Sequence, residues 1–372
     1  MIVAGEASGD MHGAALVSAL KRLHPAWRFY GVGGNKLREA GVELLADSAD
    51  MAVVGLTEVF FKLPLIKKVM QTLTRSLQDR KPAAVILIDY PDFNLRLASK
   101  AHARGIKVFY YISPQVWAWR KGRIRTIRRV VDKMAVILPF EESIYHKAGV
   151  DATFVGHPLL DLAPGRSSPQ EARGKLGLRG DLVTVALLPG SRPSEAARLL
   201  PICLKAAELM PQGDRQFILP LASTLSRQFV EKIMTAYSVD VTVVDQAVYD
   251  VLAAADLAIV ASGTATLEAA LMETPMVIIY RVSWLSYLLG KLFIRVKNIG
   301  LVNIIAGKTI VPELIQREAN PGRIAEVAAE ILGDREQRSR IKFALSGTRA
   351  LLGSPGAAER AARLLDGALS VS

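Results

Sequence analysis

The sequence has little cysteine and no cluster of residues with the spacing of metal ligands. Its one cysteine, Cys203, lies in an apolar helical pattern, which excludes a disulfide framework and a cysteine-based metal site. The five histidines are scattered, and no Asp-x-Asp motif or His/Glu grouping occurs. We therefore expect neither a metal nor another cofactor, and a reducing, cytoplasmic compartment.

A segment long enough to span a bilayer is also missing. The most apolar stretch, Val282 to Ile294, covers about 13 residues and contains Lys291, whereas a spanning helix needs about 20. Two interpretations of this stretch stay open, a core helix or an interfacial segment lying on a membrane. The first five residues run directly into a loop, so we expect no signal peptide.

What the chain does have is length, apolar residues and positive charge. Its 372 residues exceed a comfortable single core, so two domains are expected. A hydrophobic fraction of 51% excludes a disordered chain. The net charge of +12 indicates an anionic partner, which is nucleic acid, anionic lipid or a phosphorylated substrate.

Short apolar runs alternate with helical patterns along the whole chain. Such alternation indicates parallel strands joined by helices, and hence a doubly wound α/β fold. The strand candidates of the first half are Met1–Ala4, Phe29–Val32, Val85–Ile88, Val108–Ile112, Met134–Ile137 and Thr153–Val155. The helical patterns between them include Asp10–Arg22, Leu65–Leu77, Asn94–Arg104 and Glu141–Lys147.

A second series of strand candidates follows a cluster of chain-breaking residues between Gly156 and Pro169. We therefore predict two Rossmann-like domains, residues 1–164 and 165–345, with a ligand cleft between the carboxyl ends of their sheets. A helical tail, residues 346–372, is expected to cross back to the first domain. The second series comprises Leu182–Leu188, Phe217–Leu219, Val241–Val244, Leu257–Val260 and Met276–Ile279.

Two loops of the second series carry groups suited to a nucleotide diphosphate. Gly190-Ser191-Arg192 follows an apolar run and opens a helical pattern, so unpaired N–H groups and the fork-shaped Arg192 cation are available to phosphate. Ser262-Gly263-Thr264 likewise follows an apolar run and opens a helical pattern. Glu268, one helical turn further on, is placed to accept hydrogen bonds from both hydroxyls of a ribose. Together the loops predict a nucleotide-sugar enzyme that needs no metal for its diphosphate leaving group.

Asp89 stands where an apolar run of the first half ends, at the ligand-binding edge of such a sheet. A carboxylate there is able to take a proton from a sugar hydroxyl as it attacks an anomeric carbon. We predict that Asp89 does this chemistry and that Asp92 caps the following helix. His157, between the two series, has two open interpretations, a contact to the leaving group or a hinge-packing residue.

The loop after the first strand, Gly5 to Asp10, also has two interpretations. It lacks the G-x-G-x-x-G spacing of a dinucleotide site. Ser8 is either the cap of the next helix, with Asp10 favouring its positive end, or part of a wall of the cleft that touches an acceptor substrate.

One more segment combines aromatic and basic residues. Trp117 and Trp119 precede six cations between Arg120 and Arg129. This composition suits an anionic membrane interface, although nucleic acid and a plain solvated helix face are alternatives.

Several of these pieces, in the same order along the chain, resemble the lipid-A-disaccharide synthase family. The second position of Asp89-Tyr90-Pro91 departs from the family, in which it is usually small. The matching pieces are residues 3–10, 88–94, 111–120, 138–141, 155–158, 188–192, 262–268 and 301–303.

This resemblance implies a GT-B type glycosyltransferase with two Rossmann-like domains facing each other across a cleft. The enzyme would transfer diacylglucosamine from UDP-2,3-diacylglucosamine to 2,3-diacylglucosamine 1-phosphate, with inversion, and release UDP. Asp89 matches the base that deprotonates the acceptor's 6-hydroxyl. Arg192 matches a residue at the diphosphate and Glu268 one at the ribose. Glu6, Ser8 and Asp10 match acceptor-side residues, and Asn303 lies in a segment near the donor.

Substrates anchored by acyl chains imply a peripheral enzyme on the inner face of the inner membrane, with no nucleic-acid partner. The oligomeric state is left open by the sequence. The alternatives are a UDP-GlcNAc 2-epimerase or a glycan-lipid GlcNAc transferase on the same fold, and a non-enzymatic binder of nucleic acid or anionic lipid. The residues expected to face the membrane are Phe60, Phe61, Lys67, Lys68, Trp117, Trp119, Arg120 and Arg123.

Overall fold

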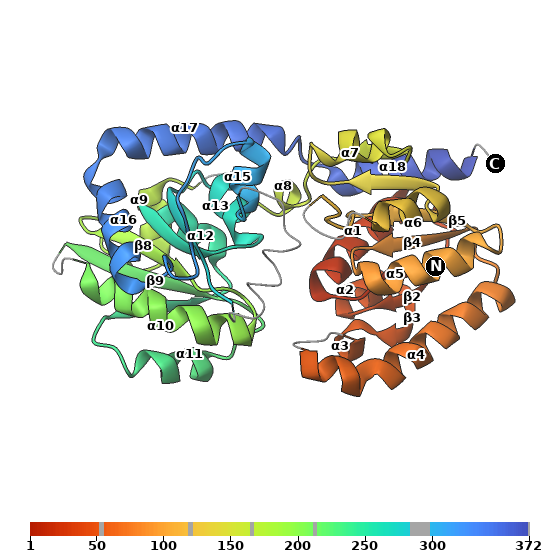
Figure 1. Cartoon of the computed structure of the whole chain (residues 1–372), viewed down its shortest axis with the longest axis horizontal. Helices are drawn as coiled ribbons and strands as arrows, with labels where there is room; N and C mark the ends of the chain where they lie inside the picture. The colour runs from red at the N-terminus through yellow and green to blue at the C-terminus, as the bar shows by residue number, and fades with distance from the viewer. Residues whose placement is uncertain (52–55, 118–121, 164–166, 211–213, 283–297, 371–372) are drawn as a thin grey trace. The chain divides into compact units, whose positions relative to one another are not determined.

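The computed structural model describes residues 1–51, 56–117, 122–163, 167–210, 214–282 and 298–370. The chain forms two compact units, and each is described by itself (Figure 1). Unit 1 consists of Met1–Asp161 together with Leu352–Ser372, and unit 2 consists of Leu162–Leu351. The last part of the chain therefore belongs with the first.

Unit 1 is built on a parallel sheet of seven strands within the described residues, in the order β3-β2-β1-β4-β5-β6-β7. Strands β1 and β4, which are far apart in sequence, lie next to each other, so the loops that follow them leave the same edge. The strands are β1 (Ile2–Ala4), β2 (Phe29–Gly33), β3 (Val42–Asp47), β4 (Ala84–Ile88), β5 (Lys107–Tyr111), β6 (Lys133–Val136) and β7 (Ala152–Phe154).

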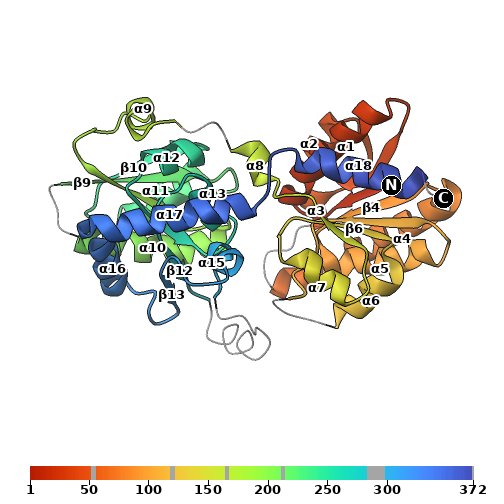
Figure 2. The same cartoon turned by 90° about the horizontal axis from the view of Figure 1, so that it is seen from above.

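Helices cover both faces of this sheet (Figure 2). On one face α1 packs against the C-terminal helix α18, and on the other α4, α5 and α6 lie side by side. The crossing back of the C-terminal helix to the first unit is as predicted. The helices are α1 (Ala7–Leu23), α2 (Asn35–Glu39), α3 (Ser48–Met51), α4 (Leu56–Asp79), α5 (Pro91–His102), α6 (Arg123–Val130), α7 (Glu141–Lys147), α8 (Leu159–Leu162) and α18 (Ala357–Ser370).

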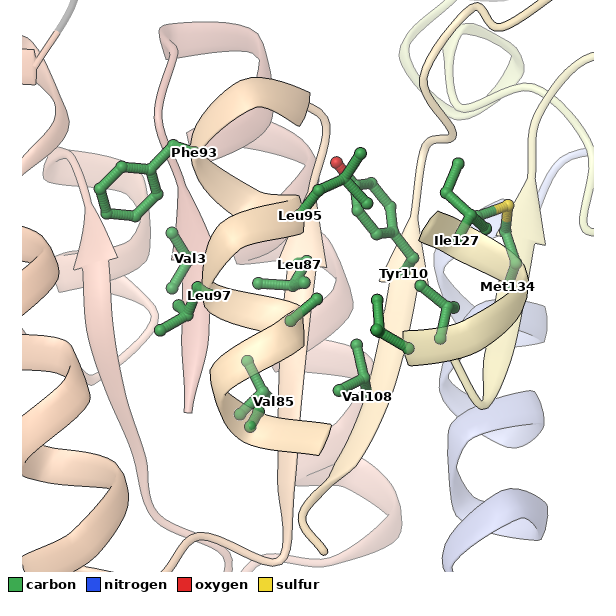
Figure 3. Packing of buried hydrophobic residues seen from close by; sticks show 14 of the residues in the cluster. Val3, Val85, Leu87, Phe93, Leu95, Leu97, Val108, Tyr110, Ile127 and Met134 are labelled. Atoms are coloured by element: carbon green, nitrogen blue, oxygen red, sulfur yellow. The ribbon is translucent and has the colours of Figure 1, made fainter. Parts of the chain in front are cut away.

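The alternation of side chains along each strand divides the apolar core of unit 1 into two layers. Val85 and Leu87 face α5, whereas Ile86 and Ile88 face α1 and α18. The same alternation separates Tyr110 from its neighbour Tyr111. Figure 3 shows the α5 layer, in which Val3, Val85, Leu87, Leu97 and Val108 pack between the sheet and the helix. Because both faces are buried, the central strands are apolar throughout.

Unit 2 repeats the architecture with a parallel sheet in the order β10-β9-β8-β11-β12-β13 within the described residues. Its strands are β8 (Val183–Leu188), β9 (Arg215–Leu221), β10 (Val241–Asp245), β11 (Leu257–Ala261), β12 (Met276–Tyr280) and β13 (Glu313–Ile315). Its helices are α9 (Pro169–Lys175), α10 (Pro193–Leu209), α11 (Arg227–Met234), α12 (Val248–Ala254), α13 (Ala265–Leu271), α15 (Leu301–Ala306), α16 (Pro321–Gly333) and α17 (Arg335–Leu351).

The structure adds detail that the sequence did not supply. The sequence patterns missed β3 and β13, which are edge strands with partly exposed side chains. The predicted boundary at 164/165 falls outside the described residues. The predicted start of the tail at 346 lies within α17, and the chain re-enters unit 1 only at Leu352. In the part of the chain described here, no helix has both the length and the apolar character needed to cross a bilayer.

Candidate functional site

The carboxyl edge of the unit 1 sheet brings Glu6 and Asp89 together. Strands β1 and β4 are paired in register, with Ala4 opposite Ile88. Asp89 follows β4 directly, and Glu6 is the N-cap residue of α1, two positions after β1. The two carboxylates therefore leave adjacent strands at the same edge, and the negative charge of Glu6 acts on Asp89.

The surroundings of Asp89 favour its protonated form. Burial raises its pKa from 3.8 to about 6, and the nearby Glu6 charge acts in the same direction, while a hydrogen bond from the Tyr90 backbone N–H opposes the shift. A carboxylate with such a pKa is mostly ionised at neutral pH, and it is a stronger base than an ordinary aspartate. This is the setting expected of a general base.

The backbone at Asp89 is unusual. Asp89 and Tyr90 both have φ of 45°, in the left-handed region that residues with side chains seldom adopt. The Tyr90 ring lies directly over Gly5, where any Cβ would collide with it. The large residue that departs from the family pattern is thus accommodated by a glycine in the neighbouring loop.

Asp10 lies in the first turn of α1, at its positive end as predicted, whereas the prediction that Ser8 caps this helix is wrong. The Asp10 carboxylate is buried and accepts hydrogen bonds from the backbone N–H groups of Gly34 at 2.6 Å, Lys36 at 3.0 Å and Leu37 at 3.1 Å. It therefore holds the β2–α2 loop. Ser8 is exposed within the first turn of α1, so it is not the helix cap. Of the three predicted acceptor-side residues, Glu6 is the one beside Asp89.

The prediction that Asp92 caps α5 is wrong. Tyr90 is the N-cap residue, and no side chain caps the helix. Asp92 lies in the first turn and forms an ion pair with Arg123 of α6. Only 12% of the Arg123 side chain is exposed, so this cation is bound to the protein and does not face outward as predicted.

A buried carboxylate that the sequence reasoning missed is Glu141, at the start of α7. It is 1% exposed and accepts hydrogen bonds from Trp117 Nε1 at 3.0 Å and the Leu138 backbone N–H at 3.2 Å. The Trp117 ring also packs edge-on against Phe140, with centroids 5.1 Å apart. Burial raises the pKa of Glu141 to about 7, against the effect of these hydrogen bonds. Trp117 is thus a partly exposed residue whose ring nitrogen is bound to a buried carboxylate of unit 1, and its contact with a membrane stays a prediction.

His157 is buried where the chain leaves unit 1 and returns to it. Its backbone N–H donates to Leu352 O at 2.9 Å, and its Nδ1 accepts from Leu159 N at 3.2 Å. Burial lowers its pKa to about 3, with a smaller contribution from His12. The imidazole is therefore neutral, and these contacts favour the hinge-packing interpretation.

In unit 2 the two predicted nucleotide loops lie next to each other. Strands β8 and β11 pair in register, with Leu188 opposite Val260, so the Gly190 and Ser262 turns begin at the same edge. Gly190 has φ of 107°, and the Glu195 side chain leaves no room for a Cβ there. Ser191 and Arg192 are exposed at the start of α10, which directs its positive dipole end toward them.

After β11, Thr264 is the N-cap residue of α13 and Glu268 lies in the first turn of this helix. Ser262 Oγ donates to Ile299 O at 3.2 Å, whereas Thr264 is exposed. Burial raises the pKa of Glu268, which lies in α13. Its charge also acts on Tyr249 of α12, whose buried hydroxyl has no hydrogen-bond partner among the described residues. Tyr249 is therefore a neighbour of Glu268 that no sequence pattern indicated.

Asn303 was predicted to contact UDP, but its amide is fully engaged within unit 2. Nδ2 donates to Val311 O at 2.9 Å and to Glu313 at 2.7 Å, and Oδ1 accepts from the backbone N–H groups of Ile310 and Val311. Glu313 in turn accepts from Ile299 N and Gly300 N. Asn303 therefore supports the loop that meets Ser262.

The structure describes only some of the other residues predicted to face a membrane. Trp119 and Arg120 lie outside the described residues, and the side chains of Phe60 and Phe61 do as well. Lys67 and Lys68 are exposed on α4. Among the described residues, no three His, Cys, Asp or Glu side chains are grouped as a metal would require.

Comparisons with known proteins agree with one another. A family model described as lipid-A-disaccharide synthetase matches residues 1–364. The lipid-A-disaccharide synthase of Syntrophus aciditrophicus is 59% identical over 97% of this chain and 95% of its own length. That of Geobacter sulfurreducens is 48% identical over 98% and 96%.

Solved structures resemble the fold at low sequence identity. A putative UDP-N-acetylglucosamine 2-epimerase from Listeria monocytogenes has a TM-score of 0.65 at 14% identity, covering 98% of this chain and 94% of its own. MurG from Acinetobacter baumannii has a TM-score of 0.57 at 14% identity, covering 96% of each chain. These likenesses confirm the predicted α/β fold with two parallel sheets and carry no information on substrate.

Proposed function

The chain belongs to the lipid-A-disaccharide synthase family, and from that premise we propose how its residues carry out the glycosyl transfer. The enzyme is a glycosyltransferase of lipid A synthesis that acts on a UDP-sugar and lipid substrates. The proposed donor is UDP-2,3-diacylglucosamine, and the proposed acceptor is 2,3-diacylglucosamine 1-phosphate. The observation that carries the proposal is Asp89, a partly buried carboxylate with a raised pKa at the end of β4.

Asp89 is the proposed general base. The acceptor 6-hydroxyl oxygen bonds to the anomeric carbon of the donor while the bond from that carbon to the diphosphate oxygen breaks. The hydroxyl proton passes to Asp89, and the bonding electrons leave with UDP. Displacement from the opposite side inverts the anomeric centre and gives the β-1′,6-linkage. Burial, and to a smaller extent the Glu6 charge, keeps the pKa of Asp89 high, so the base holds the proton more firmly than an ordinary aspartate.

The unit 2 loops are the proposed UDP site. Arg192 and the first N–H groups of α10 stabilise the charge that builds up on the departing diphosphate. Gly190 allows the backbone to approach the phosphates, and Ser191 adds a hydroxyl. Ser262, Gly263 and Thr264 line the adjacent loop, and Glu268 accepts from the ribose hydroxyls. Asn303 acts indirectly, through the hydrogen bonds that fix the Ile299–Gly300 backbone.

The test of the base compares Asp89→Asn with Asp92→Asn. An asparagine side chain keeps the size of aspartate but cannot accept a proton, so kcat of Asp89→Asn should fall by roughly 100- to 10,000-fold. Binding of UDP, measured by calorimetry, should be unchanged. Asp92→Asn removes an exposed carboxylate three residues away and should retain most activity. Product would be identified by mass spectrometry with both substrates, and near-normal turnover by Asp89→Asn would reject the assignment.

We also propose that unit 1 docks on anionic lipid through the outer face of α4, α5 and α6. Among the side chains of these helices that the structure describes, which exclude Glu58, the exposed cations far outnumber the carboxylates Asp79 and Asp92. The opposite face, formed by α1, α2 and α18, has a smaller excess of positive charge, with six cations and four carboxylates in its helices and ion pairs such as Arg22–Glu359. The exposed cations of the docking face are Lys67, Lys68, Arg75, Arg96, Lys100, Arg125, Arg128 and Arg129.

This arrangement supports a peripheral enzyme on the inner face of the inner membrane, where each cation near an anionic surface contributes about 1 kcal/mol. Charge reversal at Lys67 and Lys68 should reduce co-flotation with anionic phosphatidylglycerol vesicles and leave UDP binding intact. The matched control reverses Lys36 and Arg363, which are exposed on the opposite face. Equal flotation of both double variants would refute docking through α4.

A further inference from the structure

Two buried side chains hold the backbone carbonyl of Asp89. Tyr110, on the neighbouring strand β5, donates its hydroxyl to Asp89 O at 2.6 Å. Asn94, in the first turn of α5, donates Nδ2 to the same oxygen at 2.8 Å and to Ile88 O at 3.1 Å. Both residues are 0% exposed. One carbonyl oxygen at the edge of the sheet is thus fixed from two separate elements.

The geometry of the pair is suited to this task. Tyr110 extends from β5 within the layer beneath α5, and its hydroxyl reaches the level of the first turns of that helix (Figure 3). The Asn94 side chain also interacts with this hydroxyl, while its Oδ1 is buried and has no hydrogen-bond partner among the described residues. Because Asn94 and Tyr110 have no solvent contact, their donors have few alternatives to the Ile88 and Asp89 carbonyls.

The held carbonyl belongs to the strained part of the chain. Asp89 and Tyr90 are consecutive left-handed residues, neither of them glycine. Such backbone persists only where its surroundings over-determine it. An extended conformation at Asp89 would continue β4 and turn the carboxylate away from the direction it now takes beside Glu6. The hydrogen bonds to the carbonyl oppose this relaxation.

We propose that Tyr110 and Asn94 are positioning residues that lock the Asp89 backbone in the left-handed conformation and so aim its carboxylate. The proposal rests on the role of Asp89 as base. Neither residue touches the reacting atoms, since their polar groups end at the backbone. They act on the rate by fixing where the carboxylate stands and how much water reaches it.

The charged and titratable groups around this assembly come from several elements. Glu6 of the β1–α1 loop acts on Asp89, whereas the Tyr90 hydroxyl donates to Met51 O at 3.4 Å. Tyr145 of α7 and Arg123 of α6, which is paired with Asp92, act on Tyr110. Removing the Tyr110 hydroxyl changes none of these charges at working pH. A change in the pH dependence of the variant would therefore report on the exposure of Asp89.

The experiment compares Tyr110→Phe with Tyr111→Phe. Tyr111 is the next residue on β5, is equally buried and faces the opposite layer of the core, so it is a matched control. Tyr110→Phe should lower kcat by roughly tenfold or more, because small misplacements of a catalytic group are costly. KM should change little. The loosened carboxylate gains water, so the acidic limb of the pH profile should move to lower pH.

Each result for these variants supports or rejects the positioning role of Tyr110. Tyr111→Phe should keep the kcat and pH limb of the parent enzyme. If Tyr110→Phe matches Tyr111→Phe in both, or only loses thermal stability, the positioning role is rejected. Asn94→Ala should reproduce the kinetic change, and if it does not fold, Tyr110→Phe alone decides. Retained activity in Asp89→Asn would instead reject the proposed function, whatever the tyrosine variants do.

Discussion

The two units present the same edge of the same kind of sheet, with a shared feature and a difference. At both edges burial raises the pKa of a carboxyl group, that of Asp89 after β4 in unit 1 and that of Glu268 after β11 in unit 2. The unit 2 edge also carries glycines, hydroxyls and the exposed cation Arg192. The difference between the edges is therefore this exposed cation, which is where we propose that the negative charge of a ligand binds.

The difference shows how one kind of sheet edge is able to carry two different sets of chemical groups. A parallel sheet gathers its loops at the carboxyl edge, where helices begin with unpaired N–H groups. In unit 2 we propose that these groups, at the start of α10, bind a diphosphate. In unit 1 the corresponding room is filled by protein, since Asp10 binds the β2–α2 loop and the Tyr90 ring covers Gly5. Burial of this kind raises the pKa of a carboxyl group.

The largest expected effect is on the pH dependence of stability, and it concerns Glu141, a buried carboxylate of unit 1. The pKa of Glu141 is raised from 4.5 to about 7, so this group favours folding below pH 4.5 and loses that contribution as the pH rises through 7. Glu141→Gln has no such titration. The unfolding free energy of the parent minus that of Glu141→Gln should therefore fall by on the order of 3 kcal/mol from pH 4 to pH 8.

Urea unfolding at a series of pH values, followed by the fluorescence of Trp117 and the other tryptophans, measures this difference. If the difference in unfolding free energy between the parent and Glu141→Gln stays constant with pH, Glu141 is as well solvated as an exposed carboxylate. The contrast between the two edges would then be weaker than the geometry indicates.

The next largest effect is expected on UDP binding at the carboxyl edge of the unit 2 sheet. Arg192→Ala should weaken UDP binding by about 1.5–3 kcal/mol, the range for a hydrogen bond to a charged group. Calorimetric titration with UDP measures the loss. Lys205→Ala is the control, because Lys205 lies on the same helix in an ion pair with Glu208 and far along from the loop. Equal affinity of the two variants would remove Arg192 from the site.

Much of this contrast was visible in the sequence, because contiguous apolar runs predicted the buried strands β1, β4, β8 and β11 and the loops after them. Other features were not, because their partners are distant in the chain. Asp10 meets Gly34, Asp92 meets Arg123, and Glu141 meets Trp117, at separations of 24, 31 and 24 residues. A local pattern assigns such side chains to caps or ligands, since it contains no information on the element that packs beside them.

The most direct test of the account is the pH dependence of kcat/KM for the parent enzyme and for Glu6→Gln. If Asp89 is the base, activity should rise with pH through an apparent pKa near 6, since only the ionised carboxylate accepts the proton. Removing the Glu6 charge should move that limb to lower pH by a fraction of a unit. A profile that is flat from pH 5 to 8, or a limb that Glu6→Gln leaves in place, would contradict the account.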